Sequence, residues 1–456
     1  MGWQTGERKP RCLVTGATGY IGGRLVPRLL DQGFSVRALV RTPEKLAAVP
    51  WRQSVQVARG DLNDAASLES AFDGIDVVYY LVHSMGSAKD FAAQERRAAE
   101  NVVTAARRTG VHRIVYLSGL HPEDRALSTH LASRTAVGEI LIDSGIETVV
   151  LQAGVVVGSG SASFEMIRHL TDRLPVMTTP KWVHNKIQPI AIRDVLPYLV
   201  EAATCPVPKS RAWDVGGPDV LEYGDMMQIY ADVAGLHPRR ILVLPVLTPR
   251  IAALWVGLVT PIPSGLARPL VESLHCDAVM HNHDIDTSIP PPAGGLTPYR
   301  RAVELALTRT STEANAVGVD ATGIDVAAGL LPNDPEWAGE VVYTDTRSRH
   351  IPVDSQRLWR AVETSARVHS GRVDIMEPGR VVKVRSDSRG LGELWVETTV
   401  TPEGTGSRYQ QRTTFYPRGL PGRIYWIVAR PIWAMRQRWR KPRRGQMWES
   451  QPTTGR

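Results

Sequence analysis

The sequence predicts an α/β fold, a doubly wound parallel sheet with a small substrate lobe, followed by a smaller α+β domain. Two observations support this prediction. In the first 300 residues, short apolar runs alternate with segments of helical periodicity, as strands and helices of a parallel sheet do. From about residue 336, one helical segment precedes several strands of alternating pattern and a long helical end. We therefore expect domains at residues 1–300 and 336–436, with a linker at 301–335 and a basic tail at 437–456.

A glycine-rich turn follows the first predicted strand. Residues 12–14 are apolar, and residues 20–30 carry apolar side chains at helical spacing. Between them, Gly16 allows a tight turn, Gly19 lets a pyrophosphate approach the backbone, and Gly22 lets helix and strand pack closely. This predicts a Rossmann dinucleotide site; the alternative is the same turn in a doubly wound fold that binds no nucleotide. The other predicted cofactor contacts in the turn are Thr18, Tyr20 and Ile21.

The end of the second predicted strand, residues 34–40, bears on the choice of cofactor. A carboxylate about 20 positions past the glycines favours NAD, whereas an arginine accommodates the 2′-phosphate of NADP. That position is Arg41, with Arg37 and Lys45 nearby and no acidic residue between residues 32 and 43. The sequence therefore predicts NADP, recognised by Arg37 and Arg41. In the alternative interpretation, Arg41 and Lys45 are solvated loop charges.

Two later strand ends supply further candidate residues. After the third strand, Asp61 is placed to accept a hydrogen bond from an adenine amino group and Leu62 to pack on the ring. The alternative is that Asp61 caps the next helix, although Asn63 or Asp64 is better placed for that. Ser118 follows the fifth strand, and ligands of open parallel sheets bind at the carboxyl ends of strands. Ser118 is therefore predicted to hold the substrate oxygen, with an ordinary turn residue as the alternative.

Residues 15–22, 60–62, 101–102 and 115–119 together resemble the short-chain dehydrogenase/reductase superfamily. The most similar branch is the atypical one, with its NmrA-like and NAD(P)H-binding epimerase-like proteins. The resemblance covers roughly residues 10–300 and implies a Rossmann fold, a nicotinamide cofactor and an oxidoreductase activity. Active members carry Tyr-x-x-x-Lys on the helix after the fifth strand, where the tyrosine moves a proton and the lysine lowers its pKa.

This chain departs from that catalytic pattern. Its Ser133-Arg134 pair aligns with the family's Ser-Lys, which puts Arg134 at the lysine position and His130 at the tyrosine position. In one interpretation, His130 replaces the tyrosine as acid/base, because imidazole titrates near neutral pH, and Arg134 contacts cofactor or substrate. In the other, the proton relay is lost and the site only binds NADP(H), since arginine does not exchange protons at ordinary pH. The predicted catalytic residues are Ser118, His130 and Arg134.

Composition limits the other classes of function. The chain has 456 residues, 43% of them hydrophobic, which excludes general disorder, and it has no apolar run of about 18 residues that predicts a transmembrane helix. Its three cysteines are far apart, fit no metal-ligand spacing and suit a reducing cytoplasm. The prediction is a cytoplasmic protein with no metal site and no specific nucleic-acid partner.

A basic cluster contributes much of the formal net charge of +8. Six arginines and lysines occupy residues 436–444, interleaved with Trp433 and Trp439. Such a cluster can contact anionic lipid headgroups at the membrane periphery, bind nucleic acid non-specifically, or form the solvated end of a helix. The three interpretations stay open at this point.

The C-terminal domain is predicted from a candidate strand at residues 341–343 and a helix at 356–366, followed by three strands and a closing helix at 424–436. This order is typical of an α+β helix-grip arrangement. Residues 413–426 resemble a domain of unknown function that is often fused behind atypical reductases and is similar to the START-like (SRPBCC) superfamily. The resemblance implies binding of an apolar ligand or closure over the reductase pocket. The three strands are expected at residues 380–385, 392–400 and 409–416.

The expected function is an NADP(H)-dependent oxidoreductase that transfers hydride to a carbonyl or activated double bond of an apolar small molecule. The alternative is an NADP(H)-binding redox sensor or scaffold without turnover, as some NmrA-like proteins are. A lipid-associated accessory role rests on the C-terminal domain and the basic cluster. The sequence predicts neither the particular substrate nor the oligomeric state.

Overall fold

The computed structural model describes residues 8–82, 91–122, 125, 127–243, 254, 256–257, 259–292, 294–308, 331–332, 334–335, 337–339, 342–368, 372–387 and 391–439. Contacts divide the chain into two compact units, which are described separately. The N-terminal unit comprises Met1–Thr171 and Pro175–Gly339, and the C-terminal unit comprises Asp172–Leu174 and Glu340–Arg456. Residues 309–330 of the expected linker and 440–456 of the expected basic tail lie outside the described residues.

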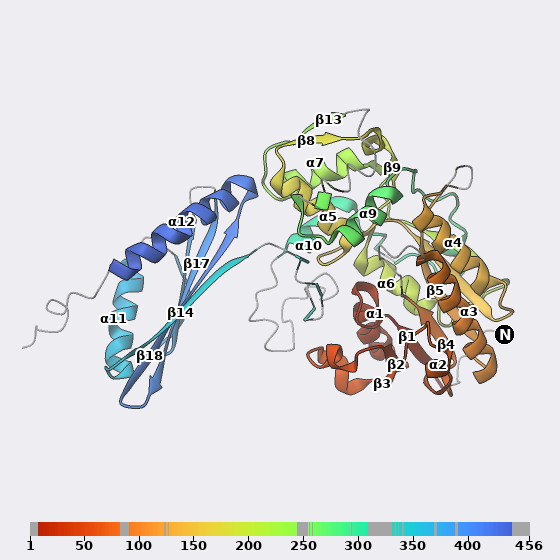
Figure 1. Cartoon of the computed structure of the whole chain (residues 1–456), viewed down its shortest axis with the longest axis horizontal. Coiled ribbons are helices and arrows are strands. Elements are labelled where there is room, and N and C mark those ends of the chain that lie inside the picture. The colour runs from red at the N-terminus through yellow and green to blue at the C-terminus, as the bar shows by residue number, and fades with distance from the viewer. Residues whose placement is uncertain are drawn as a thin grey trace, which may run out of the picture. The chain divides into compact units, whose positions relative to one another are not determined.

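A seven-stranded parallel sheet forms the centre of the N-terminal unit (Figure 1). Its order is β11-β6-β5-β4-β1-β2-β3, so the direction of winding reverses between β1 and β4. Such a reversal is the point at which open α/β sheets bind ligands. The predicted doubly wound parallel sheet is therefore confirmed. The strands are β1 (Arg11–Thr15), β2 (Ser35–Val40), β3 (Gln56–Arg59), β4 (Val77–Tyr80), β5 (Arg113–Gly119), β6 (Glu147–Ala153) and β11 (Arg211–Val215).

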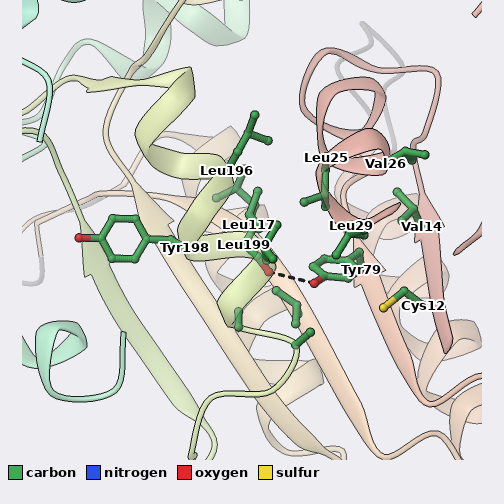
Figure 2. Packing of buried hydrophobic residues seen from close by; sticks show 14 of the residues in the cluster. Cys12, Val14, Leu25, Val26, Leu29, Tyr79, Leu117, Leu196, Tyr198 and Leu199 are labelled. Carbon is green, nitrogen blue, oxygen red and sulfur yellow. Dashed lines mark hydrogen bonds between the residues drawn. The ribbon is translucent and has the colours of Figure 1, made fainter. Parts of the chain in front are cut away.

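Helices α1 and α6 cover one face of this sheet. Leu25 and Leu29 of α1 and Leu196 and Leu199 of α6 belong to one buried hydrophobic cluster (Figure 2). The buried hydroxyl of Tyr79, on β4, donates a hydrogen bond to the carbonyl oxygen of Leu199 over 2.9 Å. The single polar group that this side chain brings into the cluster is thereby satisfied. The two helices are α1 (Tyr20–Asp31) and α6 (Ile192–Glu201).

Three further helices cover the opposite face of the sheet. They bury Phe72, Val102 and Leu141 in a second hydrophobic cluster. Because both faces are covered, the central strands are buried on both sides, which explains their continuous apolar runs in the sequence. The helices are α2 (Ala65–Phe72), α3 (Phe91–Thr109) and α4 (Thr129–Ile142).

Short elements after β6 form a lobe beside the sheet. Among the described residues, three two-stranded pairs, β7 with β10, β9 with β12 and β8 with β13, accompany helices α5, α7, α9 and α10. Within the described part of the chain, no helix combines the length and apolar character needed to cross a bilayer. The elements are β7 (Val156–Val157), α5 (Ala162–Arg173), β8 (Val176–Thr179), β9 (Lys186–Ile187), β10 (Ile190–Ala191), β12 (Leu221–Glu222), α7 (Tyr223–Val233), β13 (Arg240–Val243), α9 (Ser264–Ser273) and α10 (Tyr299–Leu307).

The C-terminal unit contains a five-stranded antiparallel sheet in the order β14-β18-β17-β16-β15. Helix α11 packs on the sheet through Leu358 and Trp359, which share a cluster with Val400. Trp426 of α12 stacks on Phe415 of β18, with ring centroids 5.3 Å apart. The elements are β14 (Tyr343–Ile351), α11 (Ser355–Val368), β15 (Arg372–Glu377), β16 (Val381–Asp387), β17 (Gly392–Glu403), β18 (Gly406–Pro417) and α12 (Gly419–Trp439).

The sequence pattern located this unit but missed two of its details. It did not predict β15, whose short stretch of mixed residues lacks a clean alternation of polar and apolar side chains. Helix α12 begins five residues before the predicted start at residue 424. The prediction began too late because the Gly-Leu-Pro-Gly opening of the helix has the composition of a turn. The observed architecture is an antiparallel sheet with a closing helix.

Candidate cofactor and substrate site

One cavity of about 730 Å³ lies at the carboxyl ends of the parallel strands, where the winding of the sheet reverses. It brings together twelve of the thirteen residues that the sequence predicted for the site. These are Gly16, Thr18, Gly19, Tyr20, Ile21, Gly22, Arg41, Asp61, Leu62, Ser118, His130 and Arg134.

The glycine turn shapes the phosphate part of this cavity. Gly16 has a φ of +73°, and a Cβ there would lie 2.8 Å from the carbonyl oxygen of Leu81. A Cβ on Gly22 would collide with the carbonyl oxygen of Gly16. Gly19, the N-cap of α1, has no side chain that could occupy the first N–H groups of the helix. The turn therefore presents the positive end of α1 to an anion, as a pyrophosphate requires.

Of the two arginines assigned to a 2′-phosphate, only Arg41 lies at the cavity. Arg41 directly follows β2, and its exposed side chain forms part of the lining. The guanidinium of Arg37 instead donates hydrogen bonds to the Gln56 side chain and to the carbonyl oxygens of Ala71 and Asp73, over 2.9–3.2 Å. These carbonyls lie where α2 ends before β4 begins, at the amino ends of the strands and opposite the cavity. The structure therefore corrects the assignment of Arg37, whose side chain joins β2 to the end of α2.

The loop after β3 is held in place by its own polar side chains. Asp61 accepts a hydrogen bond from the backbone N–H of Asn63 over 3.0 Å, and Asn101 of α3 donates one to the carbonyl oxygen of Leu62 over 2.8 Å. The helix cap that the sequence left open is Asp64, whose side chain accepts from a backbone N–H in the first turn of α2. Asp61 and Leu62 thus border the cavity on a preformed loop.

Ser118, His130 and Arg134 meet where β5 and α4 border the cavity. Ser118 is buried near the carboxyl end of β5. His130 and Arg134 are one turn apart on α4, a helix that Ser128 caps by accepting the backbone N–H of Leu131. The three residues that the sequence predicts to be catalytic therefore line the same cavity, and their catalytic roles stay a prediction.

The environment of His130 decides its protonation state. Burial, and secondarily the neighbouring Arg134 guanidinium, lower the pKa of His130 from 6.5 to about 4. The residue is 6% exposed, and its ring centroid lies 6.4 Å from that of Phe91. At pH 7 only about one His130 in a thousand carries the extra proton. This environment argues against His130 as a proton donor and favours a neutral hydrogen-bonding role.

An acidic residue that sequence reasoning did not single out lines the same cavity. Glu95 of α3 is 4% exposed and accepts a hydrogen bond from the hydroxyl of Ser133, next to Arg134. Glu95 lies in register with Ala98 and Val102 on the buried face of α3. An acidic residue within an apolar stripe was the signal in the sequence that could have identified it.

The remaining cavity wall is mainly apolar and includes residues from the lobe beside the sheet. Such a lining, with a few convergent polar groups, suits an apolar ligand. The described residues contain no cluster of three His, Cys, Asp or Glu side chains placed to hold a metal ion. The apolar and aromatic lining residues include Tyr80, Leu117, Leu120, Leu131, Val155, Val156, Tyr223 and Leu270.

Comparison with known proteins agrees with this geometry. Residues 16–156 match a family described as NAD(P)H-binding. A 3 beta-hydroxysteroid dehydrogenase/Delta 5→4-isomerase of Mycobacterium tuberculosis is 37% identical over 118 residues, which make up 24% of this chain and 31% of that enzyme. A (4-alkanoyl-5-oxo-2,5-dihydrofuran-3-yl)methyl phosphate reductase of Streptomyces griseus is 29% identical over 216 residues, 46% of this chain and 68% of the reductase. The chain thus spans less than a third of the length of the first relative.

A solved structure shares the fold of the N-terminal unit. The triphenylmethane reductase of Citrobacter sp., complexed with NADP(H), superposes with a TM-score of 0.52 at 21% identity, over 65% of this chain and 100% of the reductase. The part of the N-terminal unit that matches the NAD(P)H-binding family, residues 16–156, thus contains the glycine turn and most of the strand ends that border the cavity.

Proposed function

We propose that the protein is an NADP(H)-dependent oxidoreductase that transfers hydride to a carbonyl or activated double bond of an apolar small molecule. The observation that carries the proposal is a single cavity in which the glycine turn, Ser118 and Arg134 share walls of mainly apolar side chains. Hydride transfer needs such a shared space, because the reacting atoms must approach to about 3–3.5 Å.

The residues of the cavity fit NADP(H). The glycines of the turn leave a cradle that a Cβ would fill, and α1 directs its positive end there. Arg41 provides a guanidinium, which binds phosphate oxygens in pairs, at the strand end where a 2′-phosphate is recognised. When bound, NADPH supplies the hydride. The residues proposed to hold it are Gly16, Thr18, Gly19, Tyr20, Ile21, Gly22, Arg41, Asp61 and Leu62.

Ser118 and Arg134 are proposed to act on the substrate oxygen. Reduction leaves negative charge on that oxygen, and a guanidinium in a buried site stabilises the charge without giving up its own proton. The Ser118 hydroxyl donates a hydrogen bond to the same oxygen. Because His130 is neutral at pH 7, we favour an activated double bond as the reducible group. Its enolate product delocalises the charge and takes its proton from water.

The names of the similar proteins support an oxidoreductase. One is a steroid dehydrogenase, one a reductase of a dihydrofuran-3-yl methyl phosphate, and one a triphenylmethane reductase that binds NADP(H). All three names describe ring compounds. They agree with a cavity that is mainly apolar and holds a few polar groups.

The second candidate function is an NADP(H)-binding sensor or scaffold without turnover. The specific observation in its favour is the replacement of the tyrosine and lysine by His130 and Arg134, together with the low pKa of His130.

We also propose that the C-terminal unit is a START-like helix-grip domain. In its sheet the first strand, β14, pairs with the last, β18, and helix α12 follows β18. This arrangement supports that proposal.

The deciding experiment measures binding and oxidation of NADPH by the full chain. We expect NADPH to bind at least tenfold more tightly than NADH, and enones or quinones to be reduced faster than aldehydes. The Arg134→Met variant is expected to lose about a hundredfold in kcat/KM, and Arg134→Lys to regain part of it. Tight binding without oxidation of NADPH across the panel supports the sensor, and no binding of either nucleotide overturns both functions.

A further inference from the structure

We propose that the outer face of α12 binds the surface of an anionic lipid bilayer. This inference concerns the C-terminal unit and does not depend on the reductase activity proposed above. It rests on the exposed side chains of α12, on the way in which the helix is anchored to its sheet, and on the charge of the sequence that follows.

The exposed face of α12 is apolar. Leu420, Ile424, Ile427 and Val428 are 39%, 53%, 66% and 56% exposed. Spacings of three and four residues place them on one side of the helix. Between residues 420 and 428 the only other exposed residue is Pro421, so no exposed polar side chain lies among these four. We call these four aliphatic residues the α12 strip. A contiguous apolar strip on a surface helix marks a contact with lipid or protein.

The opposite face of α12 holds the helix on the sheet. Trp426 is 6% exposed and is stacked between Phe415 and Tyr343, with centroid distances of 5.3 and 5.7 Å. Gly422 is buried against the backbone around Pro417. The aromatic contacts of this inner face account for the packing of the helix. The α12 strip is therefore not needed for the core of the C-terminal unit.

The charge of the following sequence indicates which partner fits the strip. Residues 404–448 contain no Asp or Glu, whereas residues 430–444 contain seven arginines and lysines together with Trp433 and Trp439. Cationic and aromatic residues next to an apolar helix face are the combination that binds anionic headgroups and the acyl boundary below them. Nucleic acid would use the cations alone and gives no reason for four exposed aliphatic side chains.

The test is flotation of the full chain with lipid vesicles. Vesicles of mixed phosphatidylcholine and phosphatidylglycerol are compared with vesicles of pure phosphatidylcholine, at low and high salt. We expect binding to the anionic vesicles only, weakened by salt. The double variant Ile424→Glu, Ile427→Glu is expected to bind at least tenfold more weakly. A second variant, Lys441→Gln with Arg443→Gln and Arg444→Gln, is expected to lose several-fold in binding and much of the salt dependence.

A matched control separates the strip from a general charge effect. The double variant Val220→Glu, Leu242→Glu adds the same two charges at aliphatic residues of the N-terminal unit that are each 52% exposed. It is expected to bind vesicles within twofold of the wild type. NADPH affinity, measured on the same samples, is expected to stay unchanged in all variants, which keeps this test distinct from that of the reductase function.

The proposal is overturned by any of the following outcomes. They are an absence of vesicle binding by the wild type, equal binding by the α12 variant, equal weakening by the control variant, and binding to duplex DNA that the α12 variant retains while vesicles are ignored. A dimer that dissociates in the α12 variant, with no vesicle binding, assigns the strip to a second copy of the chain and overturns the lipid partner.

Discussion

At the scale of single residues, Arg41 occupies the position at the end of β2 where dinucleotide-binding folds distinguish the two cofactors. The Arg41→Asp variant removes a cation and adds a charge that repels a 2′-phosphate. We expect its Kd for NADPH to rise about a hundredfold, while that for NADH changes less than about threefold. Titration of the two nucleotides by fluorescence measures both constants.

Arg37 provides the control for Arg41. Its guanidinium donates hydrogen bonds to the carbonyl oxygens of Ala71 and Asp73, at the amino ends of the strands and away from the cavity. The Arg37→Gln variant should therefore leave the ratio of the Kd for NADH to the Kd for NADPH unchanged. A fall in that ratio as large as that of Arg41→Asp would restore the role that the sequence assigned to Arg37.

His130 links pH to stability through its low pKa. The unfolded chain binds a proton at His130 as the pH falls below 6.5, whereas the folded chain does so only near pH 4. The unfolded state therefore binds more protons in this window, and the free energy of unfolding falls as the pH falls through it. The contribution of neutral His130 to the free energy of unfolding is fully present above pH 6.5, and about 2–3 kcal/mol of it is lost at pH 4.5.

The variant His130→Gln isolates this contribution from other titrating groups. Urea unfolding of the N-terminal unit at pH 7 and pH 4.5 gives the loss of stability for each protein. We expect the wild type to lose about 2–3 kcal/mol more than the variant between the two pH values. Equal losses would show that the imidazole titrates alike in the folded and unfolded chains.

At the scale of elements, a buried ion pair attaches a distant segment to α1. Arg24 binds Asp334 through two hydrogen bonds of 2.7 and 3.0 Å, and the two side chains are 1% and 4% exposed. The same guanidinium lies 4.1 Å from the ring centroid of Tyr20, which lines the cavity. The sequence assigned residue 334 to the linker, yet its carboxylate belongs to the packed part of the N-terminal unit.

Asp334→Ala leaves the buried Arg24 guanidinium without its carboxylate. We expect the free energy of unfolding of the N-terminal unit to fall by about 3–5 kcal/mol, measured by urea denaturation. Asp232→Ala is the control, because its pair with Arg300 has the same distance of 2.7 Å but side chains that are 53% and 67% exposed. That variant should lose less than about 1 kcal/mol. Similar losses in both variants would contradict a special role for burial.

The elements also show how far sequence reasoning reaches. The glycine turn was predictable because its spacing, strand and helix all lie within about 20 residues, so local pattern determines the geometry. Arg37 was misassigned because the direction of its side chain depends on the end of α2, over 30 residues away. The apolar stripe of α3 marks Glu95 as buried, but local pattern does not identify its partner Ser133, nor Arg24 as the partner of Asp334.

At the scale of the whole molecule, the two units have separate cores. The clusters around β1 and around α3 contain only residues of the N-terminal unit, and the cluster around Trp359 contains only residues of the C-terminal unit. All of the described residues that line the cavity also belong to the N-terminal unit. We therefore expect a nucleotide in the cavity to stabilise the N-terminal unit.

This separation predicts two thermal transitions, of which NADPH shifts one. A ligand that binds only the folded state at a hundred times its Kd adds about 2.7 kcal/mol to the stability of the unit that holds it. For a unit of this size the corresponding rise in Tm is several degrees, while the other transition stays in place. Scanning calorimetry of the full chain, with and without NADPH, measures both. The transition that does not move should instead respond to substitutions in the C-terminal core, such as Val400→Ala. A common shift of both transitions, or a single transition, would mean that the units unfold together and that the cavity is coupled to the sheet carrying α12.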